Sequence, residues 1–597
     1  MRGIQRHRSR RGGRIGVVVL LLAILLPILS AQSVGAAAIT VDSLGDGTAV
    51  AANCMVGHVV GTCRLRDALA AAGSGGTITF AVNGTINVNQ APGALTLALN
   101  VTIQGPGATM LKIDGGCATC GAGGTATGGV TVFQVNSGVT NATISGLTIQ
   151  HGNASVLASV VGHLRLIGGG IANLGTLTVT DSVVTANSAD NGGGIANFGT
   201  LMVTRDTISN NASIGGISFG GSGGGIYNND SVTLQMTSST VSGNTAASSG
   251  IGGGLENRGA ATIVSSTFSS DSGYRGGGIE QDAGTLTLMN SVFSGNMATG
   301  ADGANTGGAI DEGIGSTITV TNSVFVNNTA AGGGGGGIEQ GEGALTLTNV
   351  TFAGNTSNGG GGIEMSGTSA LIVTNSTFSG NAGGTFGGGG ILRDNDGAVT
   401  VTNSTFSANS GTTGGALFND NSGPLTLKNT IIAGNTGGNC ATALGGTISD
   451  GGHNLQFGDA SCGATIPVQN SQLGALMDNG GTSATTLPDG SHAATLAITN
   501  SSPAFNHGDP AICTAPLPPI GMGAGSMDER GFPRGNGAAG NVTCSMGAFE
   551  LYVGLPNPLP NPQPTAPPRG VPNPLPTPRP TVVPNGISPA PLPSRRP

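Results

Sequence analysis

Residues 361–381 read GGIEMSGTSALIVTNSTFSGN, and this pattern is written ten times between residues 168 and 440. Each copy begins with a GGGI-like segment, and successive segments lie 24 to 31 residues apart. The segments end at these residues: Ile171, Ile195, Ile226, Leu255, Ile279, Ile310, Ile338, Ile363, Ile391 and Leu417. A period of this length is typical of a stack of identical supersecondary units, so the repeat decides the fold.

The columns of the repeat indicate short strands with one buried face. With Asn375 as position zero, positions −4, −2 and +3 are apolar in all ten copies, and position +6 is Asn in every copy except one, which has Asp271. Apolar residues at every second position predict strands. A unit of ~27 residues cannot bury its own apolar face, so the copies must stack. We predict an all-β chain, a right-handed parallel β-helix whose ten regular coils rise ~48 Å.

Stacking explains the residue types at the bends. Six copies have Asn at position zero, and nine have Asn at position +6. In a stack, each of these positions becomes a ladder whose side-chain amides bond to one another, and Asn also tolerates left-handed backbone. The glycine runs supply the positive φ angles that bends require. The composition agrees, because 111 of the 597 residues are Gly and only 8% are charged.

Two short motifs alternate along the stack. The motif F-x-x-N occurs at Phe293–Asn296, Phe325–Asn328, Phe352–Asn355, Phe378–Asn381 and Phe406–Asn409, and the motif GGA-[ILV] ends at Ile310 and Leu417. This alternation resembles the polymorphic outer membrane protein repeats of bacterial surface proteins. The resemblance implies a pectin-lyase-like β-helix that is displayed at the cell surface and used in adhesion.

The two ends of the chain predict an exported protein. Residues 1–38 combine an Arg-rich start, an apolar run from Val17 to Leu29 and a final Ala36-Ala37-Ala38, which is the order of a cleavable signal peptide. The apolar run is too short to span a bilayer, so we expect no transmembrane segment after cleavage. Residues 554–597 carry 17 of the 29 Pro residues, which predicts a disordered, extended tail.

The region before the repeats carries a second resemblance. Residues 39–76 contain the sequence CRLRDA at positions 63–68, which resembles the CSLREA motif found near the start of bacterial surface β-helix proteins. This segment predicts a short helix that ends at Gly73 and forms a cap over the first coil. We assign residues 77–465 to the β-helix.

The region after the repeats loses the period. Residues 466–553 contain SPAFNHGD (502–509), DERGFPR (528–534) and GAFE (547–550). In this order, the three motifs resemble the C-terminal region of choice-of-anchor family Q proteins. The resemblance implies a surface protein, and the composition predicts an irregular C-terminal region.

Eight cysteines fit an oxidising compartment, and they lie at the two ends of the chain's repeat region. Pairing each cysteine with its neighbour in sequence gives four candidate disulfides: Cys54 with Cys63, Cys117 with Cys120, Cys440 with Cys462, and Cys513 with Cys544. We therefore expect a secreted or cell-surface protein whose solenoid is cross-linked near its ends.

The charge distribution excludes one class of partner. Residues 39–553 carry 11 basic and 29 acidic residues, a net charge of −18. An acidic body repels phosphate backbones, so we expect no nucleic-acid partner.

The histidines give no sign of a metal site. The seven His residues are scattered without zinc-type spacing, so we predict no metal site and no cofactor. Ca²⁺ is the one ion that an acidic face could take. We expect a monomer.

One column of the repeat carries most of the candidate chemistry. The residue that follows each GGGI-like segment should point outward, because the Ile or Leu before it points inward. In five consecutive coils this residue is acidic: Glu256, Glu280, Asp311, Glu339 and Glu364. Neighbouring carboxylates would lie ~4.8 Å apart on one outer face, where they repel unless a cation or a proton lies between them.

Three interpretations of this column remain open. Solvated carboxylates could keep the surface soluble, with Arg258, Arg275 and Arg393 as their partners. The same column could bind Ca²⁺ or a basic ligand. It could also be catalytic, with Glu280 and Glu339 as candidates, because glycosidases use pairs of carboxylates at comparable or wider separations.

A second acidic cluster lies at Arg393-Asp394-Asn395-Asp396. Asp394 and Asp396 are candidate catalytic residues because two carboxylates and an Arg lie close together. A turn explains the same sequence without any function, because Asp, Asn and Gly are the residues that turns favour.

We predict an exported, non-enzymatic surface or extracellular protein that contacts a polysaccharide or protein of the cell surface or matrix. The first alternative is a polysaccharide lyase or glycoside hydrolase that uses the acidic column, since β-helices host such enzymes. The second alternative is a passive structural spacer.

Overall fold

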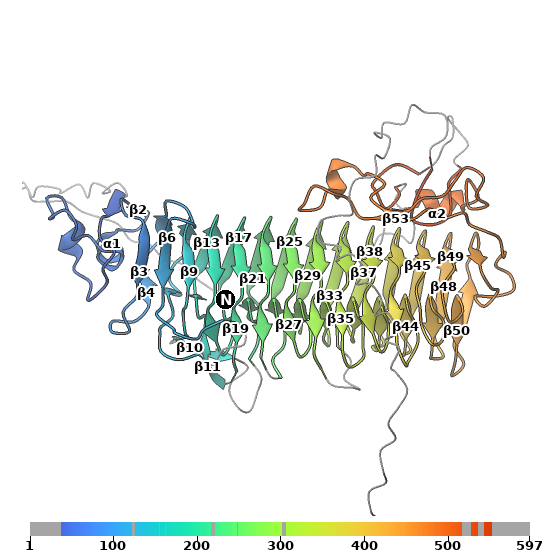
Figure 1. Ribbon diagram of the computed structural model, residues 1–597, viewed down its shortest axis with the longest axis horizontal. Helices are drawn as coiled ribbons and strands as arrows, with labels where there is room; N and C mark the ends of the chain where they lie inside the picture. Colours follow the sequence, from blue (N-terminus) through green and yellow to red (C-terminus); the bar gives the residue numbers. More distant parts are fainter. Residues whose placement is uncertain are drawn as a thin grey trace, which may run out of the picture.

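The structure is a computed structural model, and it forms a long solenoid of stacked coils (Figure 1). It describes residues 38–551 except 122–125, 155, 161–162, 216–220, 248, 301–305, 516–526 and 535–542. The predicted signal peptide before Ala38 and the Pro-rich tail lie outside the described residues.

Each regular coil contributes short strands to several sheets that run along the solenoid. One coil consists of β40 (Ile363–Met365), β41 (Leu371–Thr374), β42 (Thr377–Ser379) and β43 (Ala382–Gly383). These strands belong to an opening sheet of 13 strands, a second sheet of 15, a third of 14 and a fourth of 8. Each strand pairs in parallel with its counterpart in the next coil, for example Phe352 with Phe378. The predicted right-handed parallel β-helix is confirmed.

The opening sheet is formed by the GGGI-like segments and carries the acidic column. Its strands are β4 (Leu95–Leu97), β7 (Phe133–Val135), β12 (Ile171–Asn173), β16 (Ile195–Asn197), β20 (Ile226–Asn228), β24 (Leu255–Asn257), β28 (Ile279–Gln281), β32 (Ile310–Glu312), β36 (Ile338–Gln340), β40, β44 (Ile391–Arg393), β47 (Leu417–Asn419) and β50 (Cys440–Thr442).

The other sheets have similar extents. The second sheet runs from β1 (Ala38–Val41) to β51 (Thr447–Asp450), and the third runs from β3 (Gly84–Asn87) to β52 (Leu455–Phe457). The fourth runs from β15 (Ser188–Ala189) to β43. Before the first regular coil closes, β10 (Val156–Val160) and β11 (His163–Ile167) leave the stack as an antiparallel hairpin.

The apolar columns fill the interior. The Ile or Leu of the opening sheet, two apolar residues of the second sheet and the position +3 residue of the third sheet are fully buried in the regular coils. Six consecutive coils have Phe at position +3: Phe268, Phe293, Phe325, Phe352, Phe378 and Phe406. Neighbouring rings stack with centroids 4.6 to 5.1 Å apart and planes 6° to 11° from parallel. The ring spacing therefore follows the spacing of the strands.

The Asn residues at position +6 form a buried ladder that joins each coil to the next. Asn381 is typical: its Nδ2 donates to Oδ1 of Asn409 at 2.9 Å and to the carbonyl of Phe352 at 2.9 Å. Its backbone N–H donates to the same Oδ1 at 3.0 Å. Each side chain thus supplies hydrogen bonds to backbone groups at a bend, where the strands do not pair.

The backbone conformation decides which residue types can occupy position zero. In all ten copies this residue has a φ between 46° and 58°, whether it is Asn, Asp, Arg or Ser. The predicted second Asn ladder forms only in part: Asn349 donates to Asn322 at 2.8 Å and Asn375 donates to Asn349 at 3.2 Å, whereas the side-chain amide of Asn403 is buried without a partner among the described residues. The left-handed bend between the second and third sheets is therefore the shared requirement, and Asn meets it at low cost.

A short helix covers the first coil, as predicted. Helix α1 (Leu65–Ala71) packs against β1 and β4. The Arg66 guanidinium bonds both carboxylate oxygens of Asp46 at 2.8 and 2.9 Å and reaches the carbonyl of Ala94. The predicted glycine stop is wrong, because the helix ends at Ala71 and the next residue, Ala72, has extended backbone.

The C-terminal region folds back along the outer face of the third sheet (Figure 1, orange). It contains α2 (Pro510–Thr514) and the short antiparallel pair β53 (Leu476–Met477) and β54 (Thr495–Leu496). The buried Glu529 carboxylate accepts hydrogen bonds from the hydroxyls of Thr351 and Thr377, which belong to neighbouring coils. These contacts fasten the region to the solenoid.

The structure contains four disulfides, and they are the pairs that proximity in the sequence suggests: Cys54–Cys63, Cys117–Cys120, Cys440–Cys462 and Cys513–Cys544. The first two lie in the N-terminal cap and the early coils, and the third joins the last coils. The fourth lies within the C-terminal region.

Replacing a stacked Phe should destabilise the solenoid strongly. We expect Phe352→Ala to lower the free energy of unfolding by about 3–5 kcal/mol, because it removes two ring contacts and leaves a cavity. Phe386→Ala is the matched control, since that ring is 58% exposed and should change stability by less than about 0.5 kcal/mol. Denaturant unfolding of both variants would measure the difference, and equal losses would contradict the stacked core.

One member of the buried ladder can ionise. Asp271 occupies position +6 in its coil, and its Oδ1 accepts from Nδ2 of Asn244 at 2.9 Å. Its Oδ2 is buried and has no hydrogen-bond partner. Burial raises the pKa of Asp271 to about 8. The side chain is therefore protonated at neutral pH in the folded chain and ionised in the unfolded chain.

Asp271→Asn should stabilise the protein, and more so as the pH rises. A raised carboxyl pKa gives stability that is complete below the unfolded pKa and is lost as the pH climbs toward about 8. The amide has no such loss, so we expect a gain on the order of 1–3 kcal/mol at pH 8 and little gain at pH 4. Thermal unfolding across this pH range would measure it. A gain independent of pH would refute the ionisation argument.

Candidate functional site

The five acidic residues of the column lie side by side on β24, β28, β32, β36 and β40. The register pairs Glu256 with Glu280, Glu280 with Asp311, Asp311 with Glu339, and Glu339 with Glu364. We call this set the carboxyl row. It lies on the side of the opening sheet that faces away from the core. The prediction of solvated carboxylates is wrong, because no member of the row is more than 5% exposed.

Glycine segments cover the row. The glycine segment that leads into β40 bends over the carboxyl group that follows it, and the backbone N–H of Gly360 donates to Glu364 at 3.1 Å. Gly307 donates to Asp311 in the same way at 3.0 Å. A Cβ on Gly359 would lie 1.6 Å from Oε2 of Glu364, so only glycine leaves room for this carboxyl group. The spacing G-x-x-x-[DE] is the sequence signal that could have predicted this burial.

Two arginines neutralise the first part of the row. Arg275 contacts Glu280 at 2.7 Å and Asp311 at 3.5 Å. Arg258 lies 3.7 Å from Glu256 and also pairs with two further carboxylates, Asp230 at 2.8 Å and Asp282. These two partners were expected from the sequence.

Arg393 is not a third partner, so that expectation is wrong. Its side chain is fully buried on the core side of β44. The guanidinium donates to the carbonyl of Gly397 at 2.6 Å and to Oδ1 of Asn419 at 2.6 Å. Arg393 stands in the inward amide column of the opening sheet, and alternation along the strand turns it away from the carboxyl row.

Burial raises the pKa of every carboxyl group in the row. It raises the pKa of Glu256 to about 7, that of Asp311 to about 6 and that of Glu364 to about 7. For Glu280 and Glu339, burial and then the charge of a neighbouring carboxyl group raise the pKa well above its ordinary value. Neighbouring carboxyl groups therefore share protons near neutral pH.

Several carboxyl oxygens in this part of the structure are buried without a hydrogen-bond partner. They are Oε2 of Glu256, Oε2 of Glu280, Oε2 of Glu312 and Oε2 of Glu339. A buried polar atom that lacks a partner costs about 1–3 kcal/mol. Their burial without partners distinguishes the row from an ordinary acidic surface.

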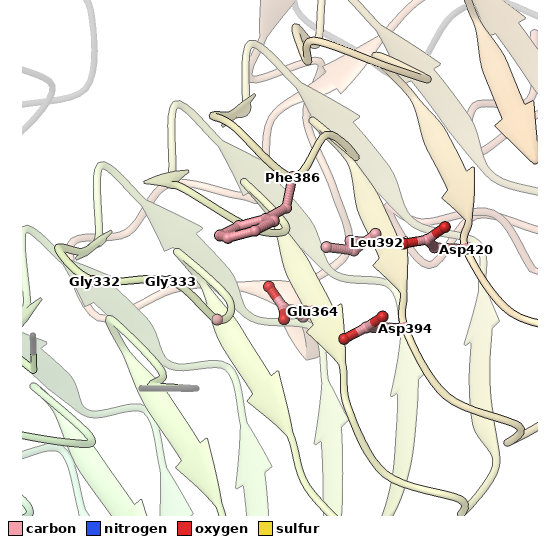
Figure 2. A pocket seen from close by; sticks show the side chains of 8 residues that line it. Gly332, Gly333, Glu364, Phe386, Leu392, Asp394 and Asp420 are labelled. Atoms are coloured by element: carbon pink, nitrogen blue, oxygen red, sulfur yellow. The ribbon is translucent and has the colours of Figure 1, made fainter. Parts of the chain in front are cut away.

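Two shallow hollows open along the row. The central hollow has a volume of about 240 Å³, and Arg275, Asp311, Glu312 and Glu339 are among its lining residues. The distal hollow has a volume of about 120 Å³ (Figure 2). Its lining residues include Glu364, Phe386, Leu392, Asp394 and Asp420. We call the carboxyl row and the two hollows together the acidic face.

The second acidic cluster divides between two environments. Asp394 lies in the distal hollow, so it joins the acidic face. Asp396 is exposed in the turn, where its Oδ1 accepts from the hydroxyl of Ser422 at 3.0 Å. The structure thus brings Asp394 together with Glu364 but does not bring Asp396 to them.

Sequence reasoning missed three residues of the acidic face. Asp420 and Asp394 occupy the same position in their coils, three residues after the inward Leu417 and Ile391. Because side chains alternate between the two faces of a strand, this spacing could have placed both Asp side chains on the outer face. Glu312 follows Asp311 in the inward amide column, where its Oε1 accepts from Ser316 at 3.1 Å. Phe386 lies in a loop between two sheets, and no periodic signal marks it.

Two further observations limit the chemistry. Within the residues that the structure describes, no three His, Cys, Asp or Glu side chains are grouped so that they could hold a metal ion. Among the same residues, no helix has the length and apolar character needed to cross a membrane.

A comparison with protein-family models supports the fold. A family model described as a right handed beta helix region matches residues 313–461, which include Glu339 and Glu364. One solved structure, the crystal structure of pectate lyase Pel9A, aligns with a TM-score of 0.33 and 10% sequence identity over 87% of this chain and 97% of that chain. No curated protein matches the chain. The resemblances to surface-protein repeats and to the two flanking motifs stay predictions.

Glu339→Gln should stabilise the folded protein at high pH. The raised pKa of Glu339 gives stability that is present below the unfolded pKa and is lost as the pH rises through the folded value. The amide avoids this loss, so its melting temperature should exceed that of the wild type by a few degrees at pH 8 and match it near pH 4. Thermal unfolding at both pH values would test this. Glu342→Gln, an exposed change on the same coil, should have no such effect.

Proposed function

We propose that this chain is an exported protein of the cell surface or extracellular space that binds an extended polysaccharide along the acidic face and does not cleave it. The observation that carries the proposal is the line of carboxyl groups along the two hollows: Asp311 and Glu339 line the central hollow, and Glu364 lines the distal one. A carboxyl group can accept hydrogen bonds, and sugar hydroxyl groups are donors.

The regular spacing of the carboxyl groups in the row suits a ligand that has a regular repeat of its own. Successive carboxyl groups follow the spacing of the strands, which is ~4.8 Å. An extended polysaccharide also presents similar hydroxyl groups at regular intervals along one direction. Each sugar could therefore meet an equivalent carboxyl group, as in other solenoids whose binding surfaces extend over several repeats. The Arg275 guanidinium, which lines the central hollow, supplies donors for sugar oxygens.

The size of the hollows favours binding over catalysis. Their volumes of about 120 and 240 Å³ are smaller than the range of roughly 300–1,000 Å³ that is typical of pockets enclosing a small ligand. Catalysis by buried carboxyl groups depends on excluding water from the reacting bond. A shallow acidic face can contact one side of a sugar chain but cannot enclose a glycosidic bond.

Export is supported by independent features. The start of the sequence has the order of a cleavable signal peptide, and all eight cysteines are paired in disulfides. Disulfides persist in oxidising compartments outside the cytosol. We propose that the protein acts as a monomer and takes no cofactor.

A glycoside hydrolase is the second candidate. Two neighbouring carboxyl groups at about the strand spacing match the geometry of retaining glycosidases. The pKa values of about 6 for Asp311 and about 7 for Glu364 would suit a general acid near neutral pH. A Ca²⁺-dependent lyase has less support, because the described residues offer no group of three acidic ligands.

Retention on insoluble polysaccharides tests the proposal. The purified protein would be passed over neutral, acidic and amine-bearing polysaccharides, with and without Ca²⁺, and the polymers would be assayed for new chain ends. We expect retention on at least one polymer without new ends. The double variant Glu280→Gln, Glu339→Gln should weaken retention by about tenfold or more, because it changes two acceptors of the row into amides.

Asp181→Asn provides the control, because this exposed carboxylate lies at the bend between the second and third sheets and pairs only with Arg205 among the charged groups. It should leave retention unchanged. Retention on no polymer would refute glycan binding and leave a protein-binding or spacer role. New chain ends that disappear in the double variant would establish the enzyme instead.

A further inference from the structure

Cations are distributed unevenly over the acidic face. Arg258 and Arg275 lie beside Glu256, Glu280 and Asp311, as described above. Beyond Asp311 the pattern changes. Across the described ranges, no ion pair links a cation to Glu312 or to four further carboxyl groups of the face, which are Glu339, Glu364, Asp394 and Asp420. We call these last four the unpaired carboxyls.

The unpaired carboxyls act on one another electrostatically. Burial raises the pKa of each, and a neighbouring negative charge raises three of them further. Glu364 raises the pKa of Glu339, Asp394 raises that of Glu364, and Asp420 raises that of Asp394. A positive group that entered the distal hollow would relieve this repulsion along the whole set.

The distal hollow also has an aromatic wall. The ring of Phe386 is 58% exposed, and Figure 2 shows it across the hollow from Glu364 and Asp394. Most other large apolar side chains of the regular coils are buried, so an exposed ring here is unusual. An aromatic face attracts a cation and packs against the apolar face of a sugar ring. Carboxylates and an aromatic ring together suit an organic cation.

A metal ion and a peptide both fit this site less well. The acidic side chains of the described chain form no group that could hold a metal ion. A bound peptide strand needs a free sheet edge, but β40 is paired with β36 on one side and with β44 on the other. Glu339 lines the neighbouring central hollow, where its carboxyl group can accept a hydrogen bond from a sugar hydroxyl group. An amino sugar carries both a cation and hydroxyl donors.

We propose that the distal half of the acidic face selects polysaccharides whose sugars carry free amino groups. This inference rests on the proposed function and names the class of its ligand. The ammonium group would lie among Glu364, Asp394 and Asp420, the sugar ring would pack on Phe386, and a hydroxyl group would donate to Glu339. N-acetylation removes the positive charge, so it should remove the selectivity while leaving the hydroxyl contacts.

Calorimetric titration with two matched ligands tests this. The probes are oligomers of glucosamine and of N-acetylglucosamine of equal length, used at slightly acidic pH where the amine is protonated. We expect the glucosamine oligomer to bind about tenfold tighter or more, because charge-assisted hydrogen bonds are the stronger class. Its binding should release protons from the unpaired carboxyls and weaken as salt is added, whereas binding of the acetylated oligomer should show neither effect.

Two variants separate the parts of the site. Glu364→Gln with Asp394→Asn should abolish the preference for the amine and its proton release, while acetylated oligomers still bind. Phe386→Ala should weaken both oligomers by a similar factor and leave the preference intact. Asp181→Asn should change none of these quantities. Thermal unfolding of each variant would show that it is folded.

The outcomes distinguish the inference from the proposed function. Equal affinity for the two oligomers would refute amine selectivity and leave glycan binding standing. Tighter binding of oligolysine than of the glucosamine oligomer would also refute it and identify a site for basic peptides. If neither oligomer binds and no polysaccharide retains the protein, the proposed function itself fails.

Discussion

In-register stacking of parallel coils places every residue directly beside the residues at the same position in the neighbouring coils. This single constraint explains most of the structure. A side chain is acceptable at a given position only if it can pack against copies of itself at the strand spacing. Phe rings meet the condition by parallel stacking, and Asn side chains meet it because each amide is both a donor and an acceptor.

Carboxyl groups meet the same condition badly, which gives the acidic face its character. A carboxylate has no donor for its neighbour, so a ladder of them must hold protons, pair with cations or leave oxygens without partners. The row uses all three solutions. Glu280 pairs with Arg275, Glu364 holds its proton to about pH 7, and Glu339 keeps an oxygen without a partner. Asp271 shows the same conflict inside the amide ladder. We expect five such residues in consecutive coils to lower the stability of the solenoid.

The solenoid needs protection at its ends and sides. Helix α1 covers the first coil, and an uncovered coil would expose strand edges to other chains. The C-terminal region protects differently, because it lies along the third sheet instead of extending the stack. Glu529 accepts hydrogen bonds from Thr351 and Thr377 in two neighbouring coils, and the backbone N–H of Ala548 donates to Thr405 in a third. The acidic face lies on another sheet, so this region leaves it open.

Sequence periodicity determined the fold, the inward columns, the Asn ladder and the position of the carboxyl row, because these depend only on alternation within a coil and on the repeat between coils. Proximity in sequence likewise gave the disulfide pairs. Only the tertiary structure showed that the row is buried, because alternation along a strand gives the face on which a side chain lies but not the path of the glycine segments that fold over it. It also turned Arg393 inward, brought Asp420 and Phe386 to Glu364, and laid the C-terminal region on the third sheet. Those contacts join residues from different coils or loops, and no repeat in the sequence encodes them.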